Sequence, residues 1–263
     1  VALPPLPRAS LYHEATSATL FPEGGYSVLD CEDLKLVFDA GPLGYPSIAA
    51  HGHADALSFC LAWKDFWWIV DPGTYSYHGD QTFRDYFKGT TAHNTATVDE
   101  QNQSRSGGPF LWTRHARAHL VGADASDDGT LCTEGYHDGY EDLGVRHRRR
   151  INVSAIKKSI TVFDSFETSN ERMRRFALRF HLAPSINLEL ADYTCTATVE
   201  NLSKYLKFEL DPRLEWSIHR GSLSPILGWY SRGLGHKEPS WTILGVTSSR
   251  SNQNFTNKLR LVD

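Results

Sequence analysis

A repeated alternation of apolar and polar side chains, in segments of strand length, constrains the fold of this chain more than any other feature. Segments of this kind are rich in β-branched and aromatic residues, as strands are. They include residues 34–38, 56–63, 66–70, 95–99, 116–121, 149–153, 159–166, 176–182, 194–199, 205–210 and 240–247. Turn-forming pairs such as Gly24-Gly25 and Lys64-Asp65 separate them. The pattern predicts an all-β fold, a large antiparallel β-sandwich of two sheets, with few short helices, at 82–87 and 201–205.

The composition is that of a folded domain and excludes two classes of partner. Of the 263 residues, 40% are hydrophobic and 12% aromatic, which is enough for a sizeable core. The 27 basic and 31 acidic residues give a net charge of −4, so we expect no nucleic-acid partner. No apolar run approaches the roughly 20 residues that cross a bilayer, so we also expect no membrane span.

The domain organisation is expected to be simple. The chain begins at Val1 with a proline-rich stretch, so residues 1–10 are predicted to be a linker that follows a missing upstream domain. No internal boundary is visible after it, and residues 11–263 are predicted to form one domain. The cysteines form no C-x-x-C pair, and either two disulfides or four buried thiols would fit them. These cysteines are Cys31, Cys60, Cys132 and Cys195.

Three side chains that commonly bind metal ions lie at the edges of successive predicted strands. His53 stands in HGHAD, Asp71 in VDPGTY and His93 in AHNT. The strands between the first two are expected to form a hairpin, which returns the chain and brings Asp71 beside His53. Two imidazoles and a carboxylate suit zinc. The residues themselves therefore make His53, Asp71 and His93 a candidate zinc site.

Two alternatives remain open at this point. If 51–55 is a strand, residues His51, His53 and Asp55 share a face, and Asp55 competes with Asp71 as the carboxylate ligand. In the other alternative no metal is bound. His53 and His93 are then hydrogen-bonded core histidines, and Asp71 caps the turn that follows it.

The chain resembles the C-terminal β-sheet domain of the heparinase II/III-like family of polysaccharide lyases. The matching stretches span most of the chain in the order found in the family. They are HGHADALSF (51–59), VDPGTYSY (70–77), FRDYFKGTTAHNTATVD (83–99), GPFLW (108–112), HDGYEDLGVRHRRRI (137–151) and GWYSRGLGHKEPS (228–240). The resemblance implies that His53, Asp71 and His93 bind one zinc ion per chain, and that this zinc is structural and holds loops that border the substrate.

The resemblance also implies roles for nearby residues. His51, the first histidine of HGHAD, is expected to be catalytic, and Arg84 and Tyr86 are expected to lie on the substrate side. The missing upstream domain is then the family's N-terminal helical toroid, which supplies the other catalytic groups. From the residues themselves, Tyr75 is predicted to contact a sugar, with core packing as the alternative. Asn94 is predicted to bind a substrate hydroxyl, with a strand cap as the alternative.

The basic cluster Arg146–Arg150 allows two interpretations. Its arginines would suit a sulfated or carboxylated glycan. On a strand, however, alternate residues face opposite sides, so an exposed sheet edge that carries charges is the simpler interpretation.

Together these features predict part of a polysaccharide lyase. The substrate is expected to be an acidic polysaccharide that contains uronic acid, glycosaminoglycan or alginate-like, cleaved by β-elimination in the full-length parent. The alternative is a non-catalytic β-sandwich that binds acidic polysaccharide or buttresses the catalytic half. An HxHxDH metallohydrolase is disfavoured, because Ala56 follows Asp55 and no βαβ alternation is present. The resemblance alone favours a periplasmic or secreted location.

Overall fold

The computed structural model describes residues 16–45, 48–200 and 202–263, and the predicted linker 1–10 lies outside them. The largest sheet, which we call sheet I, has eight strands in the order β14-β15-β16-β23-β12-β11-β10-β9. Neighbouring strands in it are antiparallel, as predicted. Its strands are β9 (Ala118–Ala125), β10 (Thr130–His137), β11 (Val145–Ser154), β12 (Ser159–Thr168), β14 (Ile186–Ala191), β15 (Thr194–Val199), β16 (Tyr205–Glu209) and β23 (Gln253–Val262).

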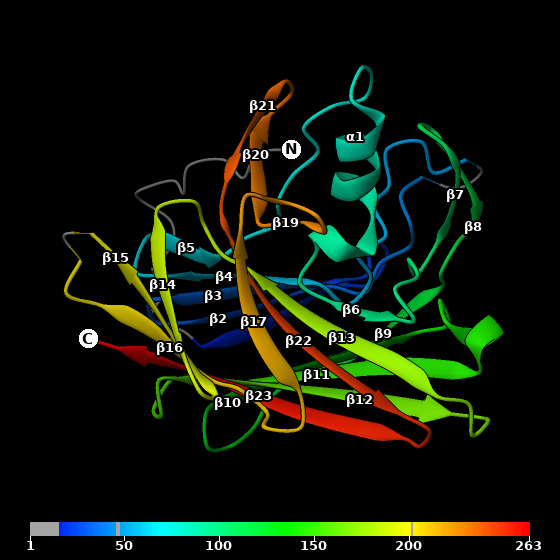
Figure 1. Ribbon diagram of the computed structural model, residues 1–263. Coiled ribbons are helices and arrows are strands. Elements are labelled where there is room, and N and C mark those ends of the chain that lie inside the picture. Colours follow the sequence, from blue (N-terminus) through cyan, green and yellow to red (C-terminus); the bar gives the residue numbers. More distant parts are fainter. Residues whose placement is uncertain (1–15, 46–47, 201) are drawn as a thin grey trace.

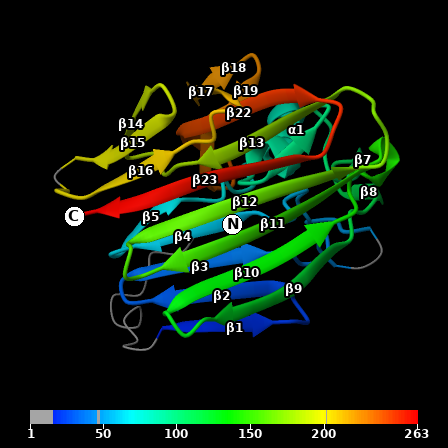
Figure 2. The same cartoon turned by 90° about the horizontal axis from the view of Figure 1, so that it is seen from below.

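The opposite layer consists of two smaller sheets. Sheet II has the order β1-β2-β3-β4-β5, and sheet III has the order β17-β22-β13-β6. Their strands are β1 (Ser17–Phe21), β2 (Tyr26–Cys31), β3 (Leu34–Asp39), β4 (Phe59–Trp63), β5 (Phe66–Ile69), β6 (Ala96–Val98), β13 (Arg174–His181), β17 (Glu215–Arg220) and β22 (Trp241–Ser249). A bridge between Ile69 and Leu182 joins the two sheets. The predicted sandwich is therefore confirmed, with one of its layers built in two parts (Figures 1 and 2).

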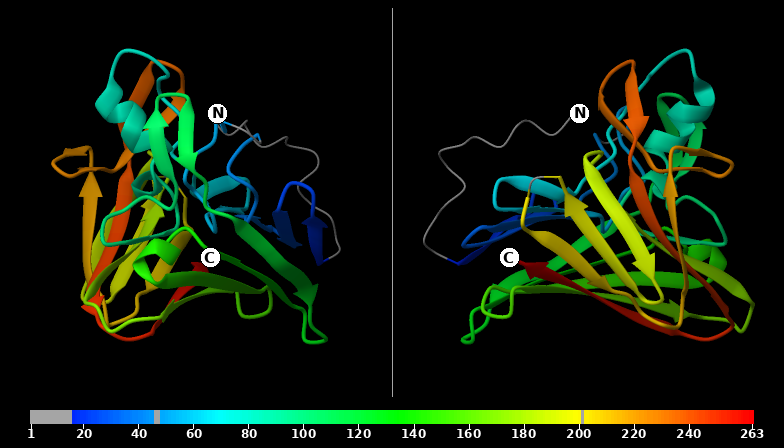
Figure 3. Two further views of the ribbon diagram at one scale, coloured as in Figure 1. Left: turned by 90° about the vertical axis from the view of Figure 1, so that its right-hand side faces the viewer. Right: turned by 60° about the vertical axis from the view of Figure 1, so that its left-hand side comes forward.

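Short elements project from the side of sheets II and III that faces away from sheet I (Figures 1 and 3). They include the helix α1 (Gln81–Lys88) and the hairpins β7–β8 and β20–β21. The strands and short helices not yet given are β7 (Arg105–Gly108), β8 (Leu111–Arg114), β18 (Ser222–Leu223), β19 (Ile226–Leu227), β20 (Trp229–Gly233), β21 (His236–Pro239), η1 (Thr90–Ala92) and η2 (Glu141–Leu143). Among the described residues, no helix has the length and apolar character needed to cross a membrane.

The two predicted helical segments have different outcomes. Segment 82–87 lies within α1, whose first turn is capped by Asp80, since the carboxylate of Asp80 accepts a hydrogen bond of 3.2 Å from the amide of Phe83. The helix predicted at 201–205 is wrong, because residues 202–204 are irregular and Tyr205 begins β16. Residue 201 lies outside the described residues.

The strand geometry assumed for segment 51–55 is also wrong, because the segment is a loop between β3 and β4. Turns on either side of it explain the difference. The Gly52 amide donates to the Ala49 carbonyl and the Ser58 amide to the Asp55 carbonyl. Leu57 then adopts a left-handed conformation with φ of 63° before β4 begins.

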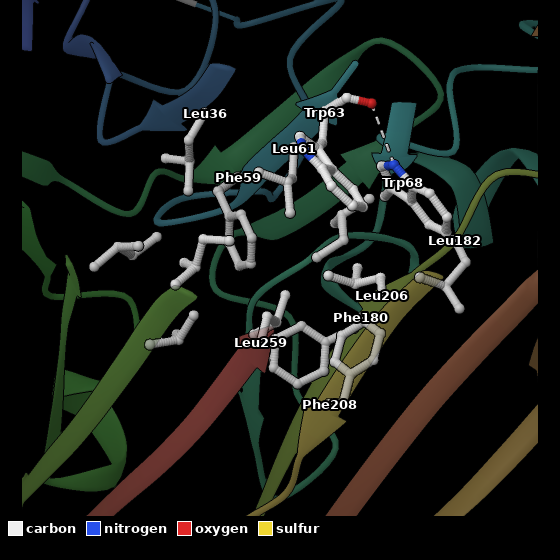
Figure 4. Packing of buried hydrophobic residues seen from close by; sticks show 14 of the residues in the cluster. Leu36, Phe59, Leu61, Trp63, Trp68, Phe180, Leu182, Leu206, Phe208 and Leu259 are labelled. Carbon is white, nitrogen blue, oxygen red and sulfur yellow. Dashed lines mark hydrogen bonds between the residues drawn. The ribbon is translucent and has the colours of Figure 1, made fainter. Parts of the chain in front are cut away.

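The main hydrophobic core lies between the layers (Figure 4). Phe59 of β4 contacts Phe180 of β13 edge to face at a ring distance of 6.3 Å. Phe180 in turn lies 5.7 Å from Phe208 of β16 in sheet I. Burial of aromatic rings from all three sheets fixes the positions of the strand ends from which the loops emerge.

Candidate metal centre and its surroundings

The structure brings the three predicted metal ligands together from different segments. His53 lies in the loop before β4, Asp71 follows β5, and His93 lies between η1 and β6. The strands β4 and β5 pair as the predicted hairpin, and this return places Asp71 next to the loop of His53. One ligand atom from each of His53, Asp71 and His93 lies within 4.8 Å of the others.

Asp71 uses its two carboxylate oxygens for different partners. One oxygen, Oδ2, lies 2.6 Å from Nδ1 of His93, and the other accepts a hydrogen bond of 2.9 Å from the amide of Gly73. The turn cap considered as an alternative is thus formed by one oxygen while the other faces the cluster. Burial opposes charge on both residues, yet their mutual attraction outweighs it, raising the pKa of His93 and lowering that of Asp71.

The chemistry of the donor set fits a divalent metal ion such as zinc. His93 is fully buried, and its Nε2 has no hydrogen-bond partner in the described part of the chain. Burial, with help from the nearby charge of His93, lowers the pKa of His53 to about 3. His53 is therefore neutral at physiological pH, which is the form that binds metal ions.

Asp55, the alternative carboxylate, is not part of the ligand cluster among the described residues. Burial, followed by the repulsion of the neighbouring Asp39 carboxylate, raises the pKa of Asp55, whereas the contact with His93 lowers that of Asp71. The structure favours Asp71.

His51 is exposed, unlike its neighbour His53, and lies among aromatic side chains. Its ring is 5.3 Å from that of Tyr77 and 6.3 Å from that of Phe110, at the tip of the β7–β8 hairpin. Tyr77 and Phe110 also stack on each other at 5.8 Å. His51 thus has an aromatic wall beside it and access to solvent. Phe110 was not singled out from the sequence, because a phenylalanine in a glycine-rich turn has no periodic signal.

Arg84, predicted on the substrate side, lies on α1 beside this wall. Its guanidinium carbon is 5.0 Å from the ring of Tyr77, and its Nη2 donates a hydrogen bond of 3.0 Å to the carbonyl of Pro109. Only 1% of Arg84 is exposed, and its Nε and Nη1 have no hydrogen-bond partner in the described residues. Two donor atoms of a buried cation are therefore left over near His51.

Tyr75 is held by packing and by a lysine that the sequence did not suggest. Its ring packs against Phe83 and Phe87 of α1, and its hydroxyl accepts a hydrogen bond of 3.0 Å from Nζ of Lys237. Lys237, on the β20–β21 hairpin, also lies 4.1 Å from the Phe83 ring. Tyr75 has a left-handed φ of 63°, a conformation that tyrosine rarely adopts.

Two residues predicted to contact substrate, Tyr86 and Asn94, lie in the interior. Tyr86 is 6% exposed and packs in a small core with Phe83 and Phe87. Asn94 is 1% exposed. Its amide nitrogen donates to the carbonyls of Phe59 and Val70, and its amide oxygen accepts from the amide of His181. The side-chain groups of Asn94 are thus committed to the protein backbone.

Comparison with known families gives a match over almost the whole chain. The sequence model described as "Heparinase II/III-like, C-terminal" matches residues 14–258. No curated protein matches the sequence.

Solved structures of similar fold include polysaccharide lyases. Heparan sulfate lyase HepC from Pedobacter heparinus is 17% identical, with a TM-score of 0.75, and the match covers 94% of this chain and 36% of HepC. A structure of heparinase III is 16% identical with a TM-score of 0.75, over 94% of this chain and 37% of that chain. At such low identity the likeness shows the fold, and this chain spans little more than a third of the length of these relatives.

Proposed function

Because the chain belongs to the heparinase II/III-like family, as a C-terminal domain, we propose that it is part of a polysaccharide lyase. The substrate would be an acidic polysaccharide that contains uronic acid, such as a glycosaminoglycan or alginate-like chain. Residues 11–263 would form the β-sandwich domain, and a helical toroid domain of the parent would complete the active site. Cleavage would proceed by β-elimination.

One observation carries the proposal. His51 is exposed and lies two residues from His53, and His53 belongs to the cluster whose ligand atoms lie within 4.8 Å of one another. A histidine on such a loop is held in place through its neighbour while its own ring stays accessible. The buried cation Arg84 lies next to the Tyr77 ring that His51 contacts, and two of its donor atoms have no hydrogen-bond partner within residues 16–45, 48–200 and 202–263. A proton-transfer group and a cation are what this reaction requires together.

The reaction removes the proton at C5 of a uronic acid and expels the glycosidic oxygen at C4. Negative charge develops on the carboxyl group as the proton leaves, so a nearby cation stabilises the transition state. An imidazole can accept or donate a proton near neutral pH, which suits His51 to acid/base work. Arg84 is only 1% exposed, so it would add positive charge from its place beside the Tyr77 ring. The remaining acid/base and carboxylate-neutralising groups would come from the helical domain.

A zinc ion bound by His53, Asp71 and His93 would supply a fixed positive charge that ties three segments of the chain together. The protein residues position one another and His51. His93 and Asp71 fix each other through their contact of 2.6 Å, and the loop of His53 then sets the position of His51. Zinc in this role is structural.

A non-catalytic role remains the second candidate, because the relatives are much longer than this chain. In that case the domain would only bind acidic polysaccharide or buttress the catalytic half. The effect of His51→Ala on the eliminase activity of the parent, seen as the ultraviolet absorbance of the unsaturated uronate product, separates the two candidates, because only a catalytic role of this domain predicts a loss.

The decisive variant is His51→Ala in the full-length parent, with His78→Ala as a matched control. His78 is also exposed, and its ring contacts Phe110 at 5.3 Å. We expect His51→Ala to lower turnover by about 100-fold or more, as the loss of a general acid or base does, with zinc content unchanged. His78→Ala should keep both. Joint loss of zinc and turnover in His51→Ala would make His51 structural instead.

A further inference from the structure

The basic cluster on β11 does not form an exposed sheet edge, because β11 lies between β10 and β12 inside sheet I. The side chains of this cluster alternate between the two faces of sheet I. Arg146, Arg148 and Arg150 face solvent, whereas His147 and Arg149 face the interior and are both 0% exposed. The inner face of this strand therefore places a histidine and an arginine between the two layers of the sandwich, where an ionised group needs partners.

A chain of buried hydrogen bonds fixes the protonation of these groups. The amide of Gly139 donates to Nδ1 of His137 over 3.0 Å, so the proton of His137 must sit on Nε2. That Nε2 lies 3.2 Å from Nδ1 of His147, and the Nε2 of His147 lies 2.7 Å from Oδ1 of Asp164. Each ring thus donates to the next member, ending at the carboxylate. Burial lowers the pKa of both histidines, which are neutral.

Arg149 donates hydrogen bonds to both oxygens of the Asp164 carboxylate, and it shares Oδ1 with His147. Its Nε lies 2.8 Å from Oδ1 and its Nη2 lies 3.1 Å from Oδ2 of Asp164. Burial alone would raise the pKa of Asp164, but Arg149 and His147 together lower it, so the pair is ionised. The remaining nitrogen of Arg149, Nη1, points across to the other layer. It donates a hydrogen bond of 2.8 Å to the carbonyl of Leu57 and another to the carbonyl of Asn94.

These two carbonyls belong to the segments that carry the metal ligands. Asn94 directly follows His93, and its side chain binds the carbonyl of Val70, the residue before Asp71. Leu57 lies four residues after His53 and has a left-handed φ of 63°. A leucine adopts that conformation only where its surroundings enforce it, and Arg149 holds its carbonyl. One guanidinium thus contacts both histidine-bearing segments and, through Asn94, the aspartate-bearing one.

We propose that Arg149 is a positioning residue of the metal centre, held by Asp164, His147 and His137 in sheet I. It sets the relative positions of the segments that carry His53, Asp71 and His93. This inference rests on the proposed zinc site and adds to it a network in the opposite sheet. The planar guanidinium can bind a carboxylate and two carbonyls at once, which the single ammonium of lysine cannot do in the same geometry.

The test compares Arg149→Lys with Arg174→Lys in this chain. Arg174 is a matched control, because it too is buried and binds a carboxylate, that of Asp99, and a carbonyl, that of Leu143. Its partners lie outside the metal-ligand segments. Zinc affinity is measured by competition with a chromophoric chelator, and the stability of the metal-free protein by urea unfolding. Cobalt substitution reports the ligand geometry through its visible spectrum.

We expect Arg149→Lys to weaken zinc binding by about 10- to 100-fold, the usual effect of losing an outer-shell partner, and to alter the cobalt spectrum. Arg174→Lys should leave the zinc affinity and the cobalt spectrum unchanged, although it should lower the stability of the metal-free protein about as much as Arg149→Lys does. If the wild-type protein binds zinc and Arg149→Lys binds it with unchanged affinity, the role of Arg149 is overturned and the metal site stands. If the wild-type protein binds no zinc, the metal site is overturned as well.

A second variant keeps the test decisive if Arg149→Lys does not fold. His137→Gln changes the outer end of the hydrogen-bond chain. His147 and Asp164 stand between His137 and Arg149 in this chain, and glutamine can still donate to His147. We expect a severalfold loss of zinc affinity in folded protein. Affinity equal to that of wild type would contradict the role of this network.

Discussion

Asn94 offers a direct test of whether its side chain serves the fold or the substrate. Replacing it by alanine removes three hydrogen bonds, two of 2.9 and 2.8 Å to the carbonyls of Phe59 and Val70 and one of 2.6 Å from the amide of His181. At a net value of about 1 kcal/mol each, their loss costs about 3 kcal/mol. The cost is higher if the two carbonyls and the His181 amide stay buried with no water molecule to bind them. We therefore expect a loss of about 3–5 kcal/mol, a large part of a typical domain's stability.

The assay is urea unfolding of the metal-free chain, with Asn170→Ala as the control. Asn170 is half-buried and its side-chain bonds are longer, at 3.4 and 3.2 Å, so its replacement should cost less than about 0.5–1 kcal/mol. For Asn94→Ala the midpoint should fall by about 1 M or more. An unchanged midpoint, together with a raised KM in the full-length parent, would refute the structural role and restore the predicted contact with a substrate hydroxyl.

Three further outcomes are expected. Zinc at about 100 times its dissociation constant should stabilise the chain against urea by about 2.7 kcal/mol, and Asp71→Asn should abolish most of that gain; equal stabilisation of both proteins would argue against the site. Lys237→Met removes a cation 4.1 Å from the Phe83 ring and a donor to Tyr75, and should cost about 1–2 kcal/mol in thermal or urea unfolding. The pKa of buried His137 lies well below 6.5 in the folded protein. As the pH falls below 6.5, this histidine therefore takes up a proton only in the unfolded state, and the folded state loses stability. His137→Gln should therefore weaken the decline in stability below that pH by up to about 1.4 kcal/mol per pH unit, and an unchanged slope would show that His137 is protonated in the folded state.

Much of the fold follows from the two-residue alternation alone. The predicted segment 194–199 coincides with β15, and 34–38 with all but the last residue of β3. Such strands have one face on the core, so their pattern records the burial directly. The division of one layer into sheets II and III leaves no such trace. It depends on the bridge between Ile69, at the end of β5, and Leu182, just after β13, which is a matter of long-range packing.

The site was less predictable because its residues lie in loops. Local sequence does not specify the turn that makes 51–55 irregular or the left-handed Leu57. The burial of Tyr86, in contrast, had a signal: Phe83, Tyr86 and Phe87 stand at positions i, i+3 and i+4 of α1, the spacing of an apolar helix face. The inner position of Arg149 also follows from strand alternation, but its partners come from distant segments.

We propose that His53, Asp71 and His93 hold a zinc ion that organises this domain. Elemental analysis of the purified chain beside its His53→Ala variant tests it most directly. We expect about one zinc per chain in the wild-type protein and its loss from the variant. The absence of metal from both proteins, with the fold intact, would contradict the claim and leave the cluster as a buried hydrogen-bonded group in a non-catalytic domain.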